Sequence, residues 1–255
     1  MSKEQVTDEV SIEWVAERVA LVEFDRPPHN YFDAELIRGV ADAYERLEGE
    51  RCSAIVLASA GKHFCAGANF ASENPASSGE LYEQAVRLFS YTVPVVAAVQ
   101  GAAIGGGLGV ALSADLRVAT PDSRFAANFA RLGIHHGFGL TVTLPLVVGH
   151  QRAIELLYAG ERLDGERAHA IGLCDRVVPA VQLRAEAIAL AQAIAASAPL
   201  AVRSIRATMR GDLPARIREA TVREGAEQAK LFATEDFAEG VAASGERRAP
   251  RFLGR

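Results

Sequence analysis

The sequence predicts an α/β fold whose first part alternates strands and helices and whose last part is helical. Two observations predict it. Short apolar runs end in glycine-rich or small-residue turns that lead into further regular structure, once over residues 54–70 and again over 94–114. From about residue 140 onward, helical patterns dominate and are interrupted by proline. Periodicity alone favours a doubly wound sheet.

The strands and the first helix follow from local patterns. Two short runs that flank a polar turn at Glu17-Arg18 predict a hairpin, and a helix is expected from about Ala34 to Leu47. Polar and small residues predict a loop over Ala71–Gly79. The expected strands are Val10–Trp14, Val19–Phe24, Ala54–Ala58, Val95–Val99, Leu116–Ala119 and Phe125–Ala126.

The later helices carry start and stop signals. Asp164 and Asp212 stand where N-caps are expected, and breaks are expected near Pro179 and Pro199. We therefore divide the chain into a core over residues 1–195 and a helical region over residues 196–255. Within that region three arginines recur at helical spacing: Arg203, Arg206 and Arg210. This spacing favours a solvated face, and a contact with another subunit or with a bound phosphate group is the alternative.

Composition excludes several classes of function. The chain has 255 residues and a net charge of −5, which argues against a general nucleic-acid binder. Its three cysteines lack metal-type spacing, so we expect reduced thiols, a cytoplasmic location and no metal. No apolar run reaches membrane-spanning length, so no membrane partner is expected.

The run from Gln100 to Gly109 (QGAAIGGGLG) is the strongest chemical signal. Unpaired N–H groups at the start of a helix can hold an anion or the developing charge on a carbonyl oxygen. The run has no lysine, which excludes a Walker-type phosphate loop, and Val110 or Leu112 stands where a dinucleotide fingerprint needs its third glycine. A purely structural turn remains an alternative.

A second turn, in residues 61–70 (GKHFCAGANF), follows the apolar run 54–58. Two turns at neighbouring strand ends could direct two main-chain N–H groups at one oxygen. Such donors are rigid and do not titrate, which suits stabilisation of an enolate.

With these residues the chain resembles the crotonase (enoyl-CoA hydratase/isomerase) superfamily. The matching segments are residues 63–68, 99–115, 160–179 and 231–252, so the resemblance covers nearly the whole chain in order. It implies a spiral of ββα units, a helical tail that forms homotrimers or homohexamers, and an acyl-CoA thioester as substrate. It implies no cofactor apart from the coenzyme A of the substrate.

The resemblance also implies site residues. The N–H groups of Ala68 and Gly106 would hold the thioester carbonyl oxygen. The residues implied to bind substrate are Ala66, Gly105, Gly109, Phe129 and Phe138.

The chain departs from the family at its acids and bases. Gly109 and Phe129 stand where hydratases of the family carry two glutamates, and neither residue can transfer a proton. This departure argues against ordinary enoyl-CoA hydration. The nearest titratable replacements are His135 and His136, which could act as acid or base. Alternatively, they are inert histidines at the start of a helix.

Three functions remain open from the sequence. The first is an acyl-CoA lyase, isomerase or hydrolase that stabilises an enolate and uses an unusual acid or base. The second is a non-catalytic acyl-CoA-binding protein that has lost its chemistry. The third is a hydrolase or C–C-cleaving enzyme acting on a carbonyl compound without coenzyme A.

Overall fold

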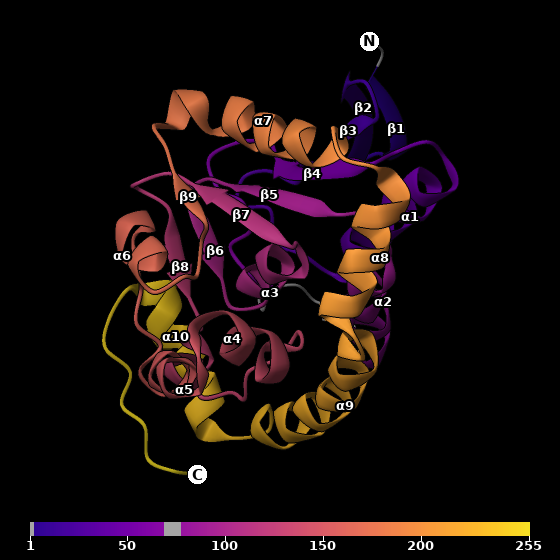
Figure 1. Cartoon of the computed structure of the whole chain (residues 1–255). Coiled ribbons are helices and arrows are strands. Elements are labelled where there is room, and N and C mark those ends of the chain that lie inside the picture. Colours follow the sequence, from indigo (N-terminus) through magenta and orange to yellow (C-terminus); the bar gives the residue numbers. More distant parts are fainter. Residues whose placement is uncertain (1–2, 69–77) are drawn as a thin grey trace.

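The computed structural model describes residues 3–68 and 78–255, and shows a mixed sheet enclosed by helices (Figure 1). The strand order of the main sheet is β1-β2-β3-β4-β5-β7-β9, antiparallel among the first three and parallel from β3 onward. These strands span Lys3–Thr7, Val10–Ala16, Val19–Phe24, Ala54–Ser59, Val95–Val99, Leu116–Ala119 and Arg176–Val177.

A second layer of short extended segments follows the main strands and generates the spiral. Strand β6 (Ala102–Ile104) pairs in parallel with β8 (Arg124–Ala126). Isolated parallel bridges extend this layer from Ala103 to Cys65 and from Ala68 to Phe32. Strands β3, β4, β5 and β7 are thus each followed by a short second extended segment and then by helical structure. The α/β class and the ββα spiral are confirmed, whereas the doubly wound sheet that periodicity favours is wrong.

Helices cover both faces of the main sheet. Helix α7 (Leu183–Ala195) lies across one face, where it packs on Val56, Val96 and Val118 (Figure 1). The opposite face carries α1 (Ala34–Gly49), α2 (Ser78–Ser90) and α3 (Gly106–Ser113) in a larger core. All eight residues of α3 are buried, so the glycine-rich run lies in the centre of the molecule.

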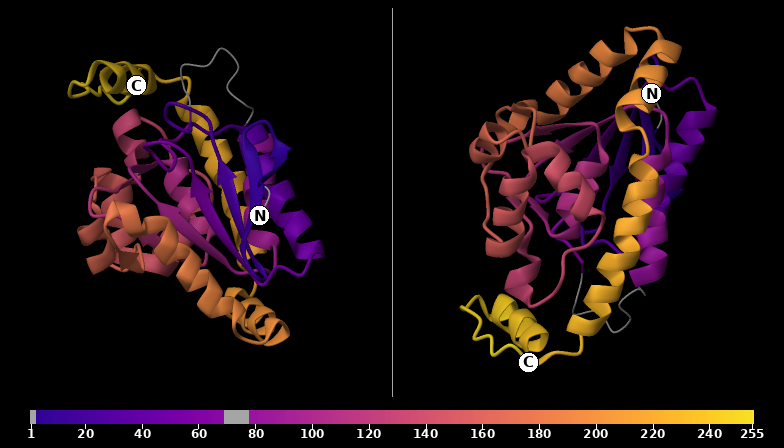
Figure 2. Two further views of the ribbon diagram at one scale, coloured as in Figure 1. Left: turned by 90° about the horizontal axis from the view of Figure 1, so that it is seen from above. Right: turned by 60° about the horizontal axis from the view of Figure 1, so that its bottom comes forward.

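Further helices complete the chain. They are α4 (Leu140–Val148), α5 (His150–Ala159), α6 (Gly165–Ala170), α8 (Pro199–Arg210), α9 (Leu213–Leu231) and α10 (Glu235–Glu246), with 3₁₀ turns η1 (Asn128–Leu132) and η2 (Ala180–Gln182). Figure 2 shows α9 lying alongside α2, and it also packs on α4. Part of the predicted helical region therefore packs on the core of its own chain.

The predicted elements agree with the structure in most places. Val95–Val99 is the strand as expected, and the side chain of Asp164 caps α6 by accepting from the Arg167 N–H at 2.9 Å. Strands β1, β6 and β9 were not predicted. The expected loop over Ala71–Gly79 ends sooner than predicted because α2 already begins at Ser78, and its first seven residues lie outside the described part of the chain.

The expected solvated arginine face on α8 is wrong. Arg206 and Arg210 expose only 8% and 12% of their side chains, and both pair with Asp115 at 2.9 and 2.8 Å. Arg203 donates to the carbonyl oxygen of Cys52 at 3.1 Å. The arginine spacing therefore marks the face of α8 that packs against the core.

No single helix among the described residues is long and apolar enough to cross a membrane. Among the described residues, one pair of segments, Ala180–Ala195 and Pro199–Arg210, has the length and apolar composition of a membrane span when the two are taken together, but they are bent by 104° relative to each other.

Candidate active site

Two turns meet at the centre of the molecule. The amide of Cys65 donates to the carbonyl of Ala102 at 2.8 Å, and the amide of Ile104 donates back to the carbonyl of Cys65 at 3.1 Å. A Cβ atom on Gly107 would lie only 2.9 Å from the carbonyl carbon of Cys65, so a larger residue there would force the turns apart. The two small-residue turns predicted from sequence are therefore direct neighbours.

The amides of Ala68 and Gly106 lie just beyond these two paired segments, each three residues after the parallel bridge between Cys65 and Ala103. Ala68 comes directly after the first segment and Gly106 after β6, and the segments run parallel. Neither the N–H of Ala68 nor that of Gly106 donates a hydrogen bond to any described residue. Gly105, the N-cap of α3, has φ of +57°, a conformation open to glycine that turns the chain from β6 into the helix. Both amides are therefore without a hydrogen-bond partner among the described residues, and they lie on turns that main-chain hydrogen bonds join.

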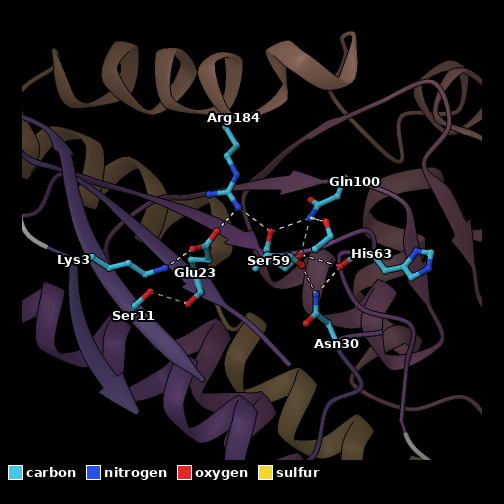
Figure 3. Close-up of polar contacts among 10 residues, drawn as sticks. Lys3, Ser11, Glu23, Asn30, Ser59, His63, Gln100 and Arg184 are labelled. Carbon is cyan, nitrogen blue, oxygen red and sulfur yellow. Dashed lines mark hydrogen bonds and ion pairs between the residues drawn. The ribbon is translucent and has the colours of Figure 1, made fainter. Parts of the chain in front are cut away.

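A polar network holds the first turn (Figure 3). The amide of Asn30 donates to the carbonyl oxygens of Ala60 and His63 at 2.8 and 2.7 Å, and Ser59 Oγ donates to the His63 carbonyl at 3.1 Å. Gln100 Nε2 donates to the carbonyl oxygen and the hydroxyl of Ser59 at 2.9 and 3.0 Å. The end of β4 and the start of the second turn are thereby joined through side chains.

The network extends across the sheet to α7. Arg184 donates to the Ser59 carbonyl at 2.9 Å and pairs with Glu23, which also pairs with Lys3 at 2.7 Å (Figure 3). The ring of His63 points away from these groups, and its Nδ1 accepts the main-chain N–H of Ala102 at 3.2 Å. His63 thus links the two turns, a role that sequence reasoning missed.

Aromatic rings surround the start of α3. Phe32, bridged to Ala68, lies where a Cβ on Gly106 would be, with its Cε1 atom only 2.6 Å from that position. The ring of Phe129 approaches Gly105, where Cζ would be 3.6 Å from an added Cβ. Both rings are buried. Phe32 was not among the predicted site residues.

Phe138 occupies the space beside Gly109. A Cβ on Gly109 would lie 2.7 Å from both Cβ and Cδ1 of Phe138, a residue that is 1% exposed. The Phe138 ring contacts that of Phe32 edge-on, with centroids 5.4 Å apart, and its backbone has φ of +62°. A larger side chain at position 109 would therefore have to displace a fixed aromatic residue.

The histidine pair lies in the loop between η1 and α4. The two rings stack with centroids 4.1 Å apart, and the His136 ring meets that of Phe129 edge-on at 6.5 Å. One aromatic ring thus separates His136 from the N-cap of α3. Burial, together with the neighbouring His135, lowers the pKa of His136 to about 4, so this imidazole is neutral at pH 7.

Three residues from distant helices hold the histidine loop. Glu224 of α9 accepts from the N–H of Gly139 at 2.8 Å, and Gln228 of α9 donates to the carbonyl of His135 at 2.9 Å. Tyr82 of α2 donates to Gln228 at 2.6 Å. Sequence reasoning missed Tyr82, Glu224 and Gln228.

Of the other predicted residues, Ala66 is half-buried in the first turn, and its N–H donates to the carbonyl of His29 at 3.1 Å. Cys65 is buried, which raises the pKa of its thiol to about 12. Among residues 3–68 and 78–255, no group of three or more histidine, cysteine or acidic side chains could hold a metal ion.

Comparison with known proteins identifies the family to which the chain belongs. A family model described as Enoyl-CoA hydratase/isomerase matches residues 15–255. The chain belongs to this family. It is 33% identical over 255 residues to a Rhodobacter capsulatus protein named "Probable enoyl-CoA hydratase", covering 94% of this chain and 96% of that protein.

Two further comparisons agree with this membership of the crotonase superfamily. The carnitinyl-CoA dehydratase of Proteus mirabilis is 32% identical over 243 residues, which cover 91% of this chain and 93% of the relative. The crystal structure of an enoyl-CoA hydratase/isomerase from Pseudoalteromonas atlantica superposes with a TM-score of 0.85 at 30% identity, covering 96% of this chain and all of that one (100%).

Proposed function

We propose that the protein is an acyl-CoA enzyme that stabilises a thioester enolate with the N–H groups of Ala68 and Gly106 and uses His136 as its acid or base. The observation that carries the proposal is a pair of amides that lack a hydrogen-bond partner within residues 3–68 and 78–255, on two turns held together by hydrogen bonds. Fixed main-chain donors stabilise a developing oxyanion without the cost of reorganising at the moment of reaction.

The aromatic lining argues against ordinary hydration. Phe129 and Gly109 offer no carboxylate, and Phe138 fills the space that a side chain at position 109 would need. A water molecule activated between two glutamates has no counterpart in this arrangement. The proposal therefore favours proton transfer at the α-carbon, as in isomerisation, decarboxylation, thioester hydrolysis or C–C cleavage, over the addition of water to a double bond.

His136 is the titratable group best placed for that proton transfer. Its ring packs on Phe129, which in turn packs at the N-cap of α3. Its lowered pKa keeps the imidazole unprotonated at neutral pH, as a base requires. The remaining properties that we propose are a homotrimeric or homohexameric assembly formed through residues 196–255 and a cytoplasmic location.

The proposal is tested by hydrogen exchange at the α-carbon. A panel of straight-chain saturated acyl-CoA thioesters is incubated with the protein in D₂O, and deuterium at the α-carbon is measured by mass spectrometry. Wild-type protein should catalyse exchange with at least one thioester, and His136→Gln should reduce the rate by about 10²–10⁴-fold. His169→Gln, on an exposed face of α6, is the matched control and should match wild type.

Two results would contradict the proposal. The first is exchange that continues at the wild-type rate in His136→Gln. The second is rapid hydration of crotonyl-CoA, because it would require an acid and a base that these residues do not supply.

A further inference from the structure

Glu224 of α9 is a buried carboxylate with a full set of donors around it. Its side chain is 1% exposed. One oxygen accepts the N–H of Gly139 at 2.8 Å, and the other accepts both the N–H and the hydroxyl of Thr141, at 3.0 and 2.6 Å. Burial raises the pKa of Glu224, while these donors oppose that shift. Main-chain amides can only donate, so both carboxyl oxygens act as acceptors.

The hydrogen bonds of Thr141 fix the proton on His136. A threonine hydroxyl has one hydrogen, and Thr141 Oγ1 donates it to Glu224 Oε1 at 2.6 Å. Thr141 Oγ1 also lies 2.8 Å from His136 Nε2, so it must accept there from an Nε2–H group. His136 is then the Nε2–H tautomer, and its Nδ1 carries the lone pair. No described residue hydrogen-bonds to that Nδ1.

The neighbouring contacts keep the pair in this arrangement. His135 Nδ1 lies 2.7 Å from the carbonyl of His136, and a carbonyl can only accept, so this nitrogen carries a hydrogen. The carbonyl of His135 is held by Gln228, which Tyr82 holds in turn. A Cβ on Gly137 would lie 2.8 Å from Gln228 Nε2, so the loop and α9 are in close contact.

We propose that Glu224 and Thr141 are positioning residues that hold His136 in the Nε2–H tautomer and leave Nδ1 as the base. This inference rests on the proposed function, because it assigns an atom to the proton transfer. In that step the substrate Cα–H bond breaks, its electron pair passes into the enolate, and the proton forms a bond to His136 Nδ1. The reverse transfer returns His136 to its neutral form.

Glu224 also has an electrostatic part in this step. When His136 gains a proton its ring becomes a cation, and Nε2 lies 4.0 Å from Glu224 Oε1. The aspartate of a serine-protease triad likewise orients a histidine and stabilises its imidazolium. Here a threonine hydroxyl lies between the carboxylate and the histidine. The charged groups facing the pair are Glu224 itself and Glu227, whose charge reaches His135.

The tautomer of His136 is directly measurable by ¹⁵N NMR of histidine-labelled protein without any substrate. Wild-type protein should show a protonated Nε2 and an unprotonated Nδ1 at neutral pH. Thr141→Val removes the hydroxyl and should convert His136 to a mixture of tautomers, whereas Thr141→Ser should restore the wild-type spectrum. Glu224→Gln should act like Thr141→Val, and Glu219→Gln, exposed on the same helix, is the matched control.

Activity should follow the tautomer. Thr141→Val and Glu224→Gln should each slow α-carbon exchange by about 10²–10³-fold through kcat, since the loss of an orienting group costs up to about 10⁴-fold in the serine-protease triad. Thr141→Ser should recover most of the rate. If Glu224→Gln does not fold, the Thr141→Val and Thr141→Ser pair still decides the question.

The outcomes separate this inference from the proposed function. An Nδ1–H tautomer in wild type, or a spectrum unchanged in Thr141→Val, would overturn the positioning role. A wild-type tautomer as predicted, combined with exchange that survives His136→Gln, would instead overturn His136 as the base and leave its hydrogen-bonded setting intact.

Discussion

Gly109→Ala is expected to destabilise the protein through one specific contact, with Phe138. The new Cβ atom would lie 2.7 Å from both Cβ and Cδ1 of Phe138 and 2.8 Å from its Cγ. A contact this short can be removed at little energetic cost only when the neighbouring atom is at the far end of a flexible side chain. Here the neighbour includes a Cβ atom, and Phe138 is buried against Phe32.

The expected magnitude comes from two opposed terms. Overpacking a core typically costs about 1–3 kcal/mol. Replacing glycine by alanine inside a helix gains about 1 kcal/mol. Because the clash involves an atom next to the backbone, we take the upper half of the cost, which leaves a net loss of about 1–2 kcal/mol.

The assay is a double-mutant cycle measured by urea unfolding at fixed protein concentration. Phe138→Gly removes the clashing atoms and suits a residue with φ of +62°. In that background Gly109→Ala should be neutral or stabilising by up to about 1 kcal/mol, since only helix propensity remains. Gly245→Ala in α10, where an added Cβ meets no atom within 4 Å, is the control and should not destabilise.

An equal loss of stability in both backgrounds would refute this reasoning. It would show that Phe138 does not limit the size of the residue at 109. The absence of a glutamate at that position would then need another physical explanation.

Three further predictions concern the buried ionisable groups. Burial lowers the pKa of His136 to about 4, so between pH 4 and about pH 6.5 the proton binds to this histidine in the unfolded chain but not in the folded one. As the pH is lowered through this range, the unfolding free energy of the wild type should fall by up to about 3 kcal/mol relative to that of His136→Gln. Above about pH 6.5 the difference between the two proteins should stay constant, and urea unfolding at several pH values measures it. Asp115→Ala leaves its two arginine partners unpaired and should cost about 3–5 kcal/mol by the same measurement; a loss below 1 kcal/mol would contradict the buried pairing. Cys65 has a pKa raised to about 12 by burial and should resist iodoacetamide at about pH 8 until urea is added, which peptide mass mapping would detect.

Local patterns predicted most of the core strands because those strands are buried and short. Val95–Val99 is an uninterrupted apolar run, and the structure buries every residue in it. Strand β1 escaped prediction because it is a polar edge strand, exposed over Lys3–Gln5. Strand β6 lies inside the glycine-rich run, where its pairing depends on residues 124–126 and no local alternation indicates it.

The site was predictable only in part, for the same reason. The two glycine-rich turns are visible in sequence, but their contact depends on the pairing of Cys65 with Ala103. Glu224 lies 85 residues from Gly139, so nothing near the histidine pair indicates it. One signal was available. Glu224 shares the buried face of α9 with Ile217 and Gln228, and a buried carboxylate is costly unless it is hydrogen-bonded or paired with a charge.

The central claim is that two main-chain amides polarise a thioester carbonyl, and vibrational spectroscopy tests it most directly. A saturated acyl-CoA carrying a ¹³C-labelled carbonyl is bound to the His136→Gln variant, in which turnover is suppressed while both amides remain. Isotope-edited infrared difference spectra should show the carbonyl stretch at lower frequency than in water, as expected when two fixed donors hold the oxygen. A bound carbonyl that vibrates at its aqueous frequency or above would contradict the account.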